Sequence, residues 1–84
     1  MTYLWLPGLP VRVESDAIKT PQAFEWQGAR HGVRVVTNRW RLDETWWAGH
    51  VRRDYFKLAT ETGLLVVLYW DWVSGGWFLE RLWD

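Results

Sequence analysis

The fold of this chain is decided by one apolar stretch, Leu64-Leu65-Val66-Val67-Leu68-Tyr69-Trp70. Apolar side chains would lie on both faces of a strand formed by these residues, since successive side chains alternate between faces. Such a strand must be covered on both sides or closed within a barrel. The stretch therefore predicts the central strand of a curled sheet, and it is far shorter than the ~20 apolar residues of a membrane span.

Compact turns flank this stretch. Thr60-Glu61-Thr62-Gly63 precedes it, with glycine at a position suited to positive φ, and Ser74-Gly75-Gly76 follows it. Alternating residues in 77–83 and the segment 51–60 complete two neighbouring strands. The last three strands are therefore predicted to form an antiparallel meander.

The N-terminal half shows the same period of two. Residues 11–14 and 24–27 alternate apolar and polar side chains, which predicts a hairpin. A third strand starts at Val33, and its apolar positions change phase near Val36. A phase change within a strand indicates a bulge, and bulges let small sheets curl into barrels. Residues 43–45 interrupt the pattern and are expected to form a short helical turn.

Together these patterns predict an all-β fold, a small curled antiparallel sheet or half-open SH3-like barrel of about five strands. The 84 residues fit one domain, with an apolar N-terminal arm at residues 1–9 and a β domain at 10–84. The chain lacks cysteine, and its N-terminus lacks the basic region and unbroken apolar run of a signal peptide. We expect a cytoplasmic location, no disulfide and no membrane contact.

Nine tryptophans stand out in so short a chain. Each ring can bury about 150–250 Å², and a domain of this size needs dense packing to be stable. Alternation predicts that most of the rings are structural. The expected core contains Phe24, Trp26, Val35, Trp40, Phe56, Leu68, Trp70, Trp77 and Leu79.

Catalytic chemistry has little support in the sequence. The two histidines, His31 and His50, lie in expected turns without cysteine or a spaced carboxylate pair, a weak set of metal ligands. The two serines show no nucleophile signature, and no glycine-rich segment matches a phosphate loop. We expect a non-enzymatic protein with no catalytic residue, metal or cofactor.

Arginines and tryptophans cluster in the middle of the chain. Residues 29–53 carry six arginines against two acids, and residues 54–84 carry two bases against five acids. These charges either pair across strands or form a dipolar surface. The candidate binding residues are Arg39, Arg41, Trp46, Trp47, Arg52, Arg53, Trp72 and Trp83.

This cluster has three interpretations: structural cation–π stacking, an interface for a partner protein, and a surface for single-stranded nucleic acid. The zero net charge of the chain weighs against nucleic acid. If Trp46 and Trp47 lie in an extended segment, one ring enters the core and the other is exposed.

Several motifs together resemble a small bacterial domain of unknown function, which is similar to a C-terminal segment of ImuB-type proteins. The resemblance covers residues 10–84 and depends most on Trp46-Trp47-x-Gly49, Arg52-Arg53-Asp54-Tyr55-Phe56 and Gly76-Trp77-Phe78-Leu79-x-Arg81. ImuB-type proteins are inactive relatives of Y-family translesion polymerases and act in an error-prone repair complex. The present chain lacks their polymerase-like body.

The resemblance implies a non-catalytic interaction module, accessory to DNA repair or translesion synthesis through protein–protein contacts. A protein of an error-prone repair complex is the expected partner. Single-stranded DNA binding by the same surface is one alternative. A structural homo-oligomer that hides surplus tryptophan in its own interface is another.

Overall fold

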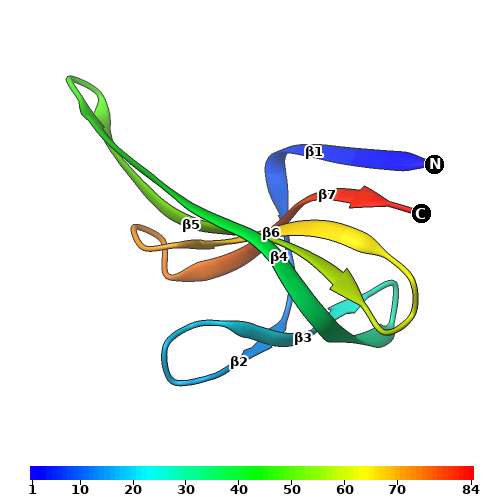
Figure 1. Ribbon diagram of the computed structural model, residues 1–84. Coiled ribbons are helices and arrows are strands. Elements are labelled where there is room, and N and C mark those ends of the chain that lie inside the picture. The colour runs from blue at the N-terminus through cyan, green and yellow to red at the C-terminus, as the bar shows by residue number, and fades with distance from the viewer.

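The computed structural model describes residues 1–84 as seven strands without a helix. They are β1 (Thr2–Pro10), β2 (Val13–Ser15), β3 (Pro21–Trp26), β4 (Ala29–Trp46), β5 (Gly49–Thr60), β6 (Leu65–Asp71) and β7 (Gly76–Trp83) (Figure 1). All neighbours are antiparallel, in the order β1-β7-β6-β5-β4-β3-β2. The all-β class and the C-terminal meander are confirmed.

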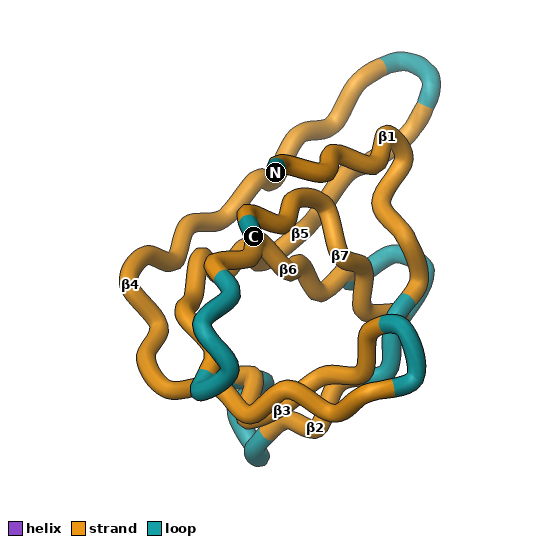
Figure 2. The backbone as a smooth tube through the Cα atoms, turned by 90° about the vertical axis from the view of Figure 1, so that its right-hand side faces the viewer, coloured by secondary structure: helices purple, strands orange, loops and turns teal.

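The strand count differs from the expected five because the N-terminal segment also joins the sheet. Residues 2–10 pair with β7 as strand β1, and residues 13–15 pair separately with β3 as β2. Between these strands the Val11 N–H donates to the Trp77 carbonyl at 3.2 Å, and the Glu25 N–H donates to the Arg12 carbonyl at 3.0 Å. This crossing draws β2 and β3 toward β7, and the sheet curls into a half-barrel (Figure 2).

Strand β4 contains the irregularity that its sequence predicts. Its register against β5 shifts between Val33 and Val35 and again between Val36 and Asn38. From Asn38 onward the pairing is continuous to Trp46. The two shifts therefore separate a bent segment in the barrel from a regular segment beyond it.

The main core fills the concave side of the sheet. Its buried members are Phe24, Phe56, Leu58, Val66, Leu68, Trp77, Leu79 and Leu82. Five of the nine predicted core residues are buried: Phe24, Phe56, Leu68, Trp77 and Leu79. Trp26 and Trp70 are partly buried and pack against this core.

The predictions for Val35 and Trp40 are wrong, because each side chain is 45% exposed. The register shifts explain Trp40. Beyond them Arg39 lies opposite the core residue Phe56, so Trp40 pairs with Tyr55 on the other face. Val35 lies between the two shifts, where regular alternation is lost.

A second apolar cluster covers the convex side of β6. Tyr55, Val67 and Tyr69 are buried there, and Leu42, Phe78 and Trp83 pack around them. Strand β1 also comes close at Gly8, where a Cβ atom would lie 2.7 Å from the Tyr69 hydroxyl oxygen. These contacts explain why β6 is apolar on both faces.

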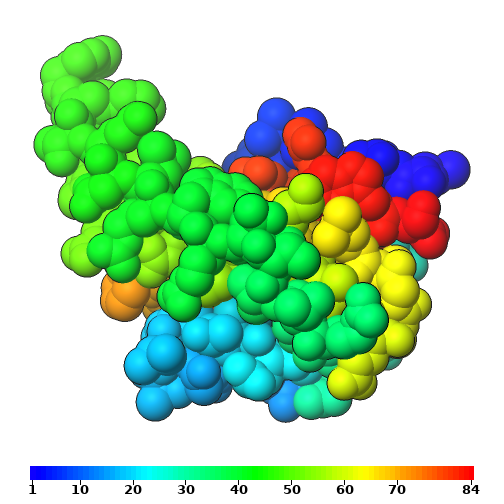
Figure 3. All heavy atoms as spheres, viewed as in Figure 1, coloured from blue at the N-terminus to red at the C-terminus, as the bar shows by residue number.

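The helical turn predicted at residues 43–45 is wrong. Strand β4 continues through this segment, with Asp43 opposite Arg52 and Trp46 opposite Gly49, and residues 47–48 form the turn. Strand β6 accompanies β5 only between Arg53 and Ala59. We name residues 39–55 the distal hairpin, which projects from the barrel at the upper left of Figures 1 and 3.

Candidate functional site

The distal hairpin brings together most of the predicted binding residues. It carries Arg39, Arg41, Trp46, Trp47, Arg52 and Arg53, and Trp72 packs against it from the turn after β6. Trp83 is different, because it lies near the C-terminal end of β7, half-buried, beside Lys57 and Arg81. The structure thus groups seven of the eight candidates and separates one.

One face of the distal hairpin is charged. Its members are Arg39, Arg41, Asp43, His50, Arg52 and Asp54, which alternation and cross-strand pairing place together. Arg41 donates from Nε and Nη2 to the two Asp54 carboxylate oxygens at 2.6 and 3.2 Å. Asp43 lies 2.6 Å from His50 Nε2. We call this the charged face.

Asp54 is the most heavily contacted group of the charged face. Besides Arg41, the Trp72 indole N–H donates to its Oδ2 at 2.9 Å. The hydrogen bond from Arg41, opposed by partial burial and helped by that from Trp72, holds the pKa of Asp54 below its ordinary value. The carboxylate therefore stays ionised and connects β4, β5 and the turn after β6.

The other candidate arginines also have partners within the chain. The Arg39 guanidinium carbon lies 5.0 Å from the centroid of the Phe56 ring, and that of Arg52 lies 5.3 Å from the Trp72 ring. Arg53 lies 3.9 Å from Asp71 and stacks 4.6 Å from the Tyr69 ring. The expected pairing of charges across strands is confirmed at Arg41–Asp54 and Arg53–Asp71.

The opposite face of the hairpin is predominantly apolar. Alternation places on it Trp40, Leu42, Trp46, Val51 and Tyr55, with Glu44 and Arg53 between them. Trp40 stacks on Tyr55 with ring centroids 5.2 Å apart and planes 2° from parallel. This stack joins the exposed end of the hairpin to the buried convex cluster. We call this surface the aromatic face.

The paired tryptophans lie at the tip of the hairpin. Trp46 is 57% exposed at the end of β4, and Trp47 is 99% exposed in the turn. The expectation that one of them enters the core is wrong. The hairpin extends beyond the barrel, so no second layer lies opposite either face at this point.

The sequence patterns did not identify Trp40 as an exposed residue or Leu42 as a half-buried residue on the same convex side. The available signal was their even-numbered alternation with Trp46 after the phase change. Because Phe56 defines the core side of β5 and lies opposite the odd-numbered Arg39, the even positions face away from the core. That pairing could not be read before the register of the two strands was known.

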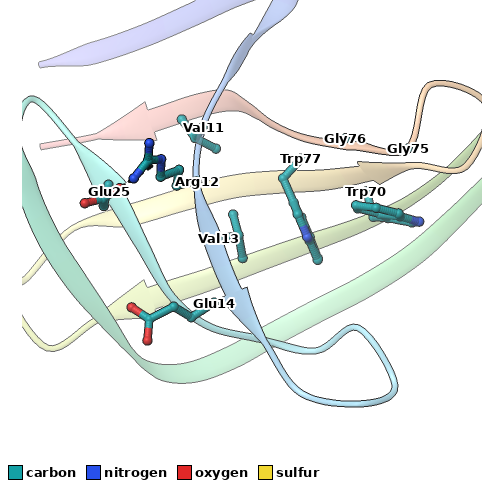
Figure 4. Close-up of a pocket in the computed structure, with 9 residues that line it drawn as sticks. All are labelled: Val11, Arg12, Val13, Glu14, Glu25, Trp70, Gly75, Gly76 and Trp77. Atoms are coloured by element: carbon teal, nitrogen blue, oxygen red, sulfur yellow. Dashed lines mark ion pairs between the residues drawn. The ribbon is translucent and has the colours of Figure 1, made fainter.

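A separate cavity of about 490 Å³ opens at one end of the half-barrel (Figure 4). It is lined by Val11, Arg12, Val13, Glu14, Glu25, Trp70, Gly75, Gly76 and Trp77. Arg12 and Glu25 lie 3.8 Å apart at its rim, and the Lys19 ammonium lies 4.3 Å from the centroid of the Trp70 ring. Its lining comes from segments that are far apart in the chain, so no local pattern in the sequence indicates this cavity.

In the distal hairpin and in the cavity, as elsewhere in the chain, no three histidine, aspartate or glutamate side chains come close enough together to hold a metal ion. None of the elements is a helix with the length and hydropathy needed to span a membrane. Comparisons with protein-family models, curated proteins and solved structures found no match to this chain. The geometry of the distal hairpin therefore carries the functional argument.

Proposed function

We propose that this chain is a non-catalytic protein-binding module and that the aromatic face and tip of the distal hairpin contact the partner. The observation that carries this proposal is the exposure of Trp40, Trp46 and Trp47 on a hairpin that extends beyond the core. Tryptophan is enriched among the residues that dominate protein interfaces, where it is desolvated on binding. Large exposed apolar side chains gathered on one face in this way are typical of an interaction site.

The charges of the hairpin favour a protein over single-stranded nucleic acid. Phosphate binding needs arginines that are free to reach the ligand. Here Arg41 and Arg53 are paired with carboxylates, so only Arg39 and Arg52, which lie over aromatic rings, are without an ion pair in the hairpin. With a net charge of zero, the chain supplies no excess of positive charge for a polyanion.

The resemblance to the ImuB-type segment supports a setting in DNA repair or translesion synthesis, with a protein of an error-prone repair complex as the partner. A similarity in scale to SH3 barrels would fit the same role, because small barrels commonly present binding surfaces.

Site-specific photo-crosslinking in the native host tests the proposed surface. A photoreactive residue replaces Trp47 at the tip, and the matched control carries it at the exposed Gln22 on β3. We expect a discrete adduct with a second protein at position 47 only, identified by mass spectrometry. The adduct should disappear when Trp40 and Trp46 are both changed to alanine, with the β-sheet circular dichroism unchanged.

Absence of any protein adduct at position 47 would contradict the proposal. Titration with a labelled single-stranded oligonucleotide at two salt concentrations separates the alternative, since phosphate contacts make affinity fall steeply with salt. Tight, strongly salt-dependent binding that is lost on changing Trp46 and Trp47 would replace the protein-binding proposal with a nucleic-acid one.

A further inference from the structure

The outer edge of β4 is unpaired along most of the strand. Strand β3 pairs with β4 only from Ala29 to Gly32, and no other strand lies on that side of residues 33–46. The two register shifts distort this edge up to Asn38. From Arg39 to Thr45 the edge is regular, which is the condition for adding another strand.

The backbone groups that point outward can be identified from one hydrogen bond. The Trp72 N–H donates to the Arg52 carbonyl at 2.9 Å, so the backbone of Arg52 faces away from β4. In an antiparallel pair, opposite residues either bond to each other or both turn away. Asp43, the partner of Arg52, therefore directs its N–H and C=O to the open edge, and so by alternation do Arg39, Arg41 and Thr45.

The side chains along this edge are complementary to themselves in reverse order. If two β4 strands pair antiparallel with Arg41 at the two-fold axis, Arg39 of each copy lies opposite Asp43 of the other. Trp40 of each copy then lies opposite Leu42 of the other, on the aromatic face. Opposite charges and apolar pairs at directly facing positions stabilise a sheet.

Other registers match less well. An axis at Leu42 pairs Arg41 with Asp43 but places Trp40 opposite Glu44 and Arg39 opposite Thr45, and an axis at Trp40 places Arg39 opposite Arg41. In the register about Arg41 the only like-charge pair is Arg41 with its own copy, and each Arg41 already has a carboxylate partner in Asp54. Asp43 contacts His50 through Oδ1, so its Oδ2 is left for Arg39 of the other copy. The register about Arg41 is therefore the one that combines two Arg39–Asp43 pairs with two apolar Trp40–Leu42 pairs.

We propose that two copies of this chain associate through the open edges of β4, antiparallel and centred on Arg41. The product is a continuous sheet in which β5 and β4 of one copy are followed by β4 and β5 of the other. The two aromatic faces then lie side by side on one surface. This inference goes beyond the proposed function, because it uses the backbone edge of the hairpin and leaves its aromatic face exposed.

Sedimentation equilibrium of the full chain with two charge variants, Arg39→Asp and Asp43→Arg, tests this arrangement. We expect the wild-type protein to change from 10.1 kDa to twice that mass as its concentration rises. Each variant alone should dimerise about tenfold more weakly, because two attractive pairs become repulsive. An equimolar mixture of the two variants should regain dimerisation, since residues 39 and 43 are then oppositely charged across the interface.

Replacement of Arg41 provides a second test. Proline at this position removes the N–H that faces the edge, whereas alanine keeps it, and both lose the contact with Asp54. We expect Arg41→Ala to dimerise and Arg41→Pro to remain monomeric, with thermal unfolding used to verify that both are folded.

A wild-type protein that stays monomeric into the millimolar range overturns the inference, as does a dimer that the charge variants do not affect. These outcomes leave the proposed function intact if position 47 still forms an adduct with a different protein. Conversely, a dimer with the expected variant behaviour and no such adduct supports this inference and removes the proposed function.

Discussion

The two ends of the β4–β5 ladder use the same two strands for different purposes. Near the barrel, Phe56 and Leu58 are buried in the concave core while Tyr55 is buried in the convex cluster. Beyond the barrel, Trp46 is 57% exposed and Trp47 is 99% exposed. An aromatic side chain of the β4–β5 ladder is therefore buried only where a second layer of the protein lies opposite its strand.

The two regions also differ in what stabilises them. The barrel end is held by apolar packing, which contributes about 25 cal/mol for each Å² of apolar surface removed from water. The distal end is held by the Arg41–Asp54 ion pair and by cross-strand aromatic pairs such as Trp40–Tyr55, which contribute about 0.2–1 kcal/mol each. An isolated hairpin is marginally stable at best, so the distal end depends on its connection to the barrel.

The largest difference in stability between the two regions is expected when one tryptophan is removed from each. Trp77, which is 9% exposed, contacts Phe56 and Trp70 within the core. Changing Trp77 to alanine should lower the free energy of unfolding by about 3–5 kcal/mol, whereas Trp47→Ala should change it by less than about 0.5 kcal/mol. Urea unfolding followed by circular dichroism measures both, and similar losses for the two variants would contradict the division into regions.

The barrel was largely predictable because its patterns are local. The run from Leu64 to Trp70 indicates a strand covered on both faces whatever lies around it, and the phase change near Val36 identifies the bend in β4. The N-terminal strand β1 was missed because the expected arm at residues 1–9 carries no clear alternation that distinguishes pairing from loose packing.

The environment of the distal hairpin was less predictable because it depends on the strand register and on how far the neighbouring strand β6 extends. Alternation assigns Trp40 and Trp46 to one face, but it does not say which face is the core or how far the strands run past it. The register shifts after Val33 and Val36 determine which face of β4 is the core side. The end of the β5–β6 pairing at Arg53 determines how far the hairpin runs beyond the core. The residues were thus identified as candidates while their environment was not.

Trp40 lies at the boundary between the two regions, so its loss should have an intermediate effect. Its ring stacks on Tyr55, which is buried, while its own side chain is 45% exposed. Changing Trp40 to alanine should lower the free energy of unfolding by about 1 kcal/mol, the range of an aromatic pair. Trp46→Ala, six residues nearer the tip on the same face, is the control and should cost less than about 0.5 kcal/mol. Equal losses of stability for the two variants would show that Trp40 does not lie at the boundary between the two regions.

Asp54 gives the smallest effect, and its sign follows from its pKa. Because Arg41 above all holds the native pKa of Asp54 below its ordinary value of 3.8, the unfolded chain takes up the proton first as the pH falls. The stabilisation is therefore complete above pH 3.8 and is lost as the pH falls through the lower native pKa. Thermal unfolding from neutral pH into this acid range should show a smaller acid destabilisation for Asp54→Asn than for the wild-type protein. Asp84→Asn, which alters an exposed terminal carboxylate outside the hairpin, should keep the wild-type profile. Identical acid profiles for wild type and Asp54→Asn would show that the ionised Asp54 carboxylate does not stabilise the folded chain.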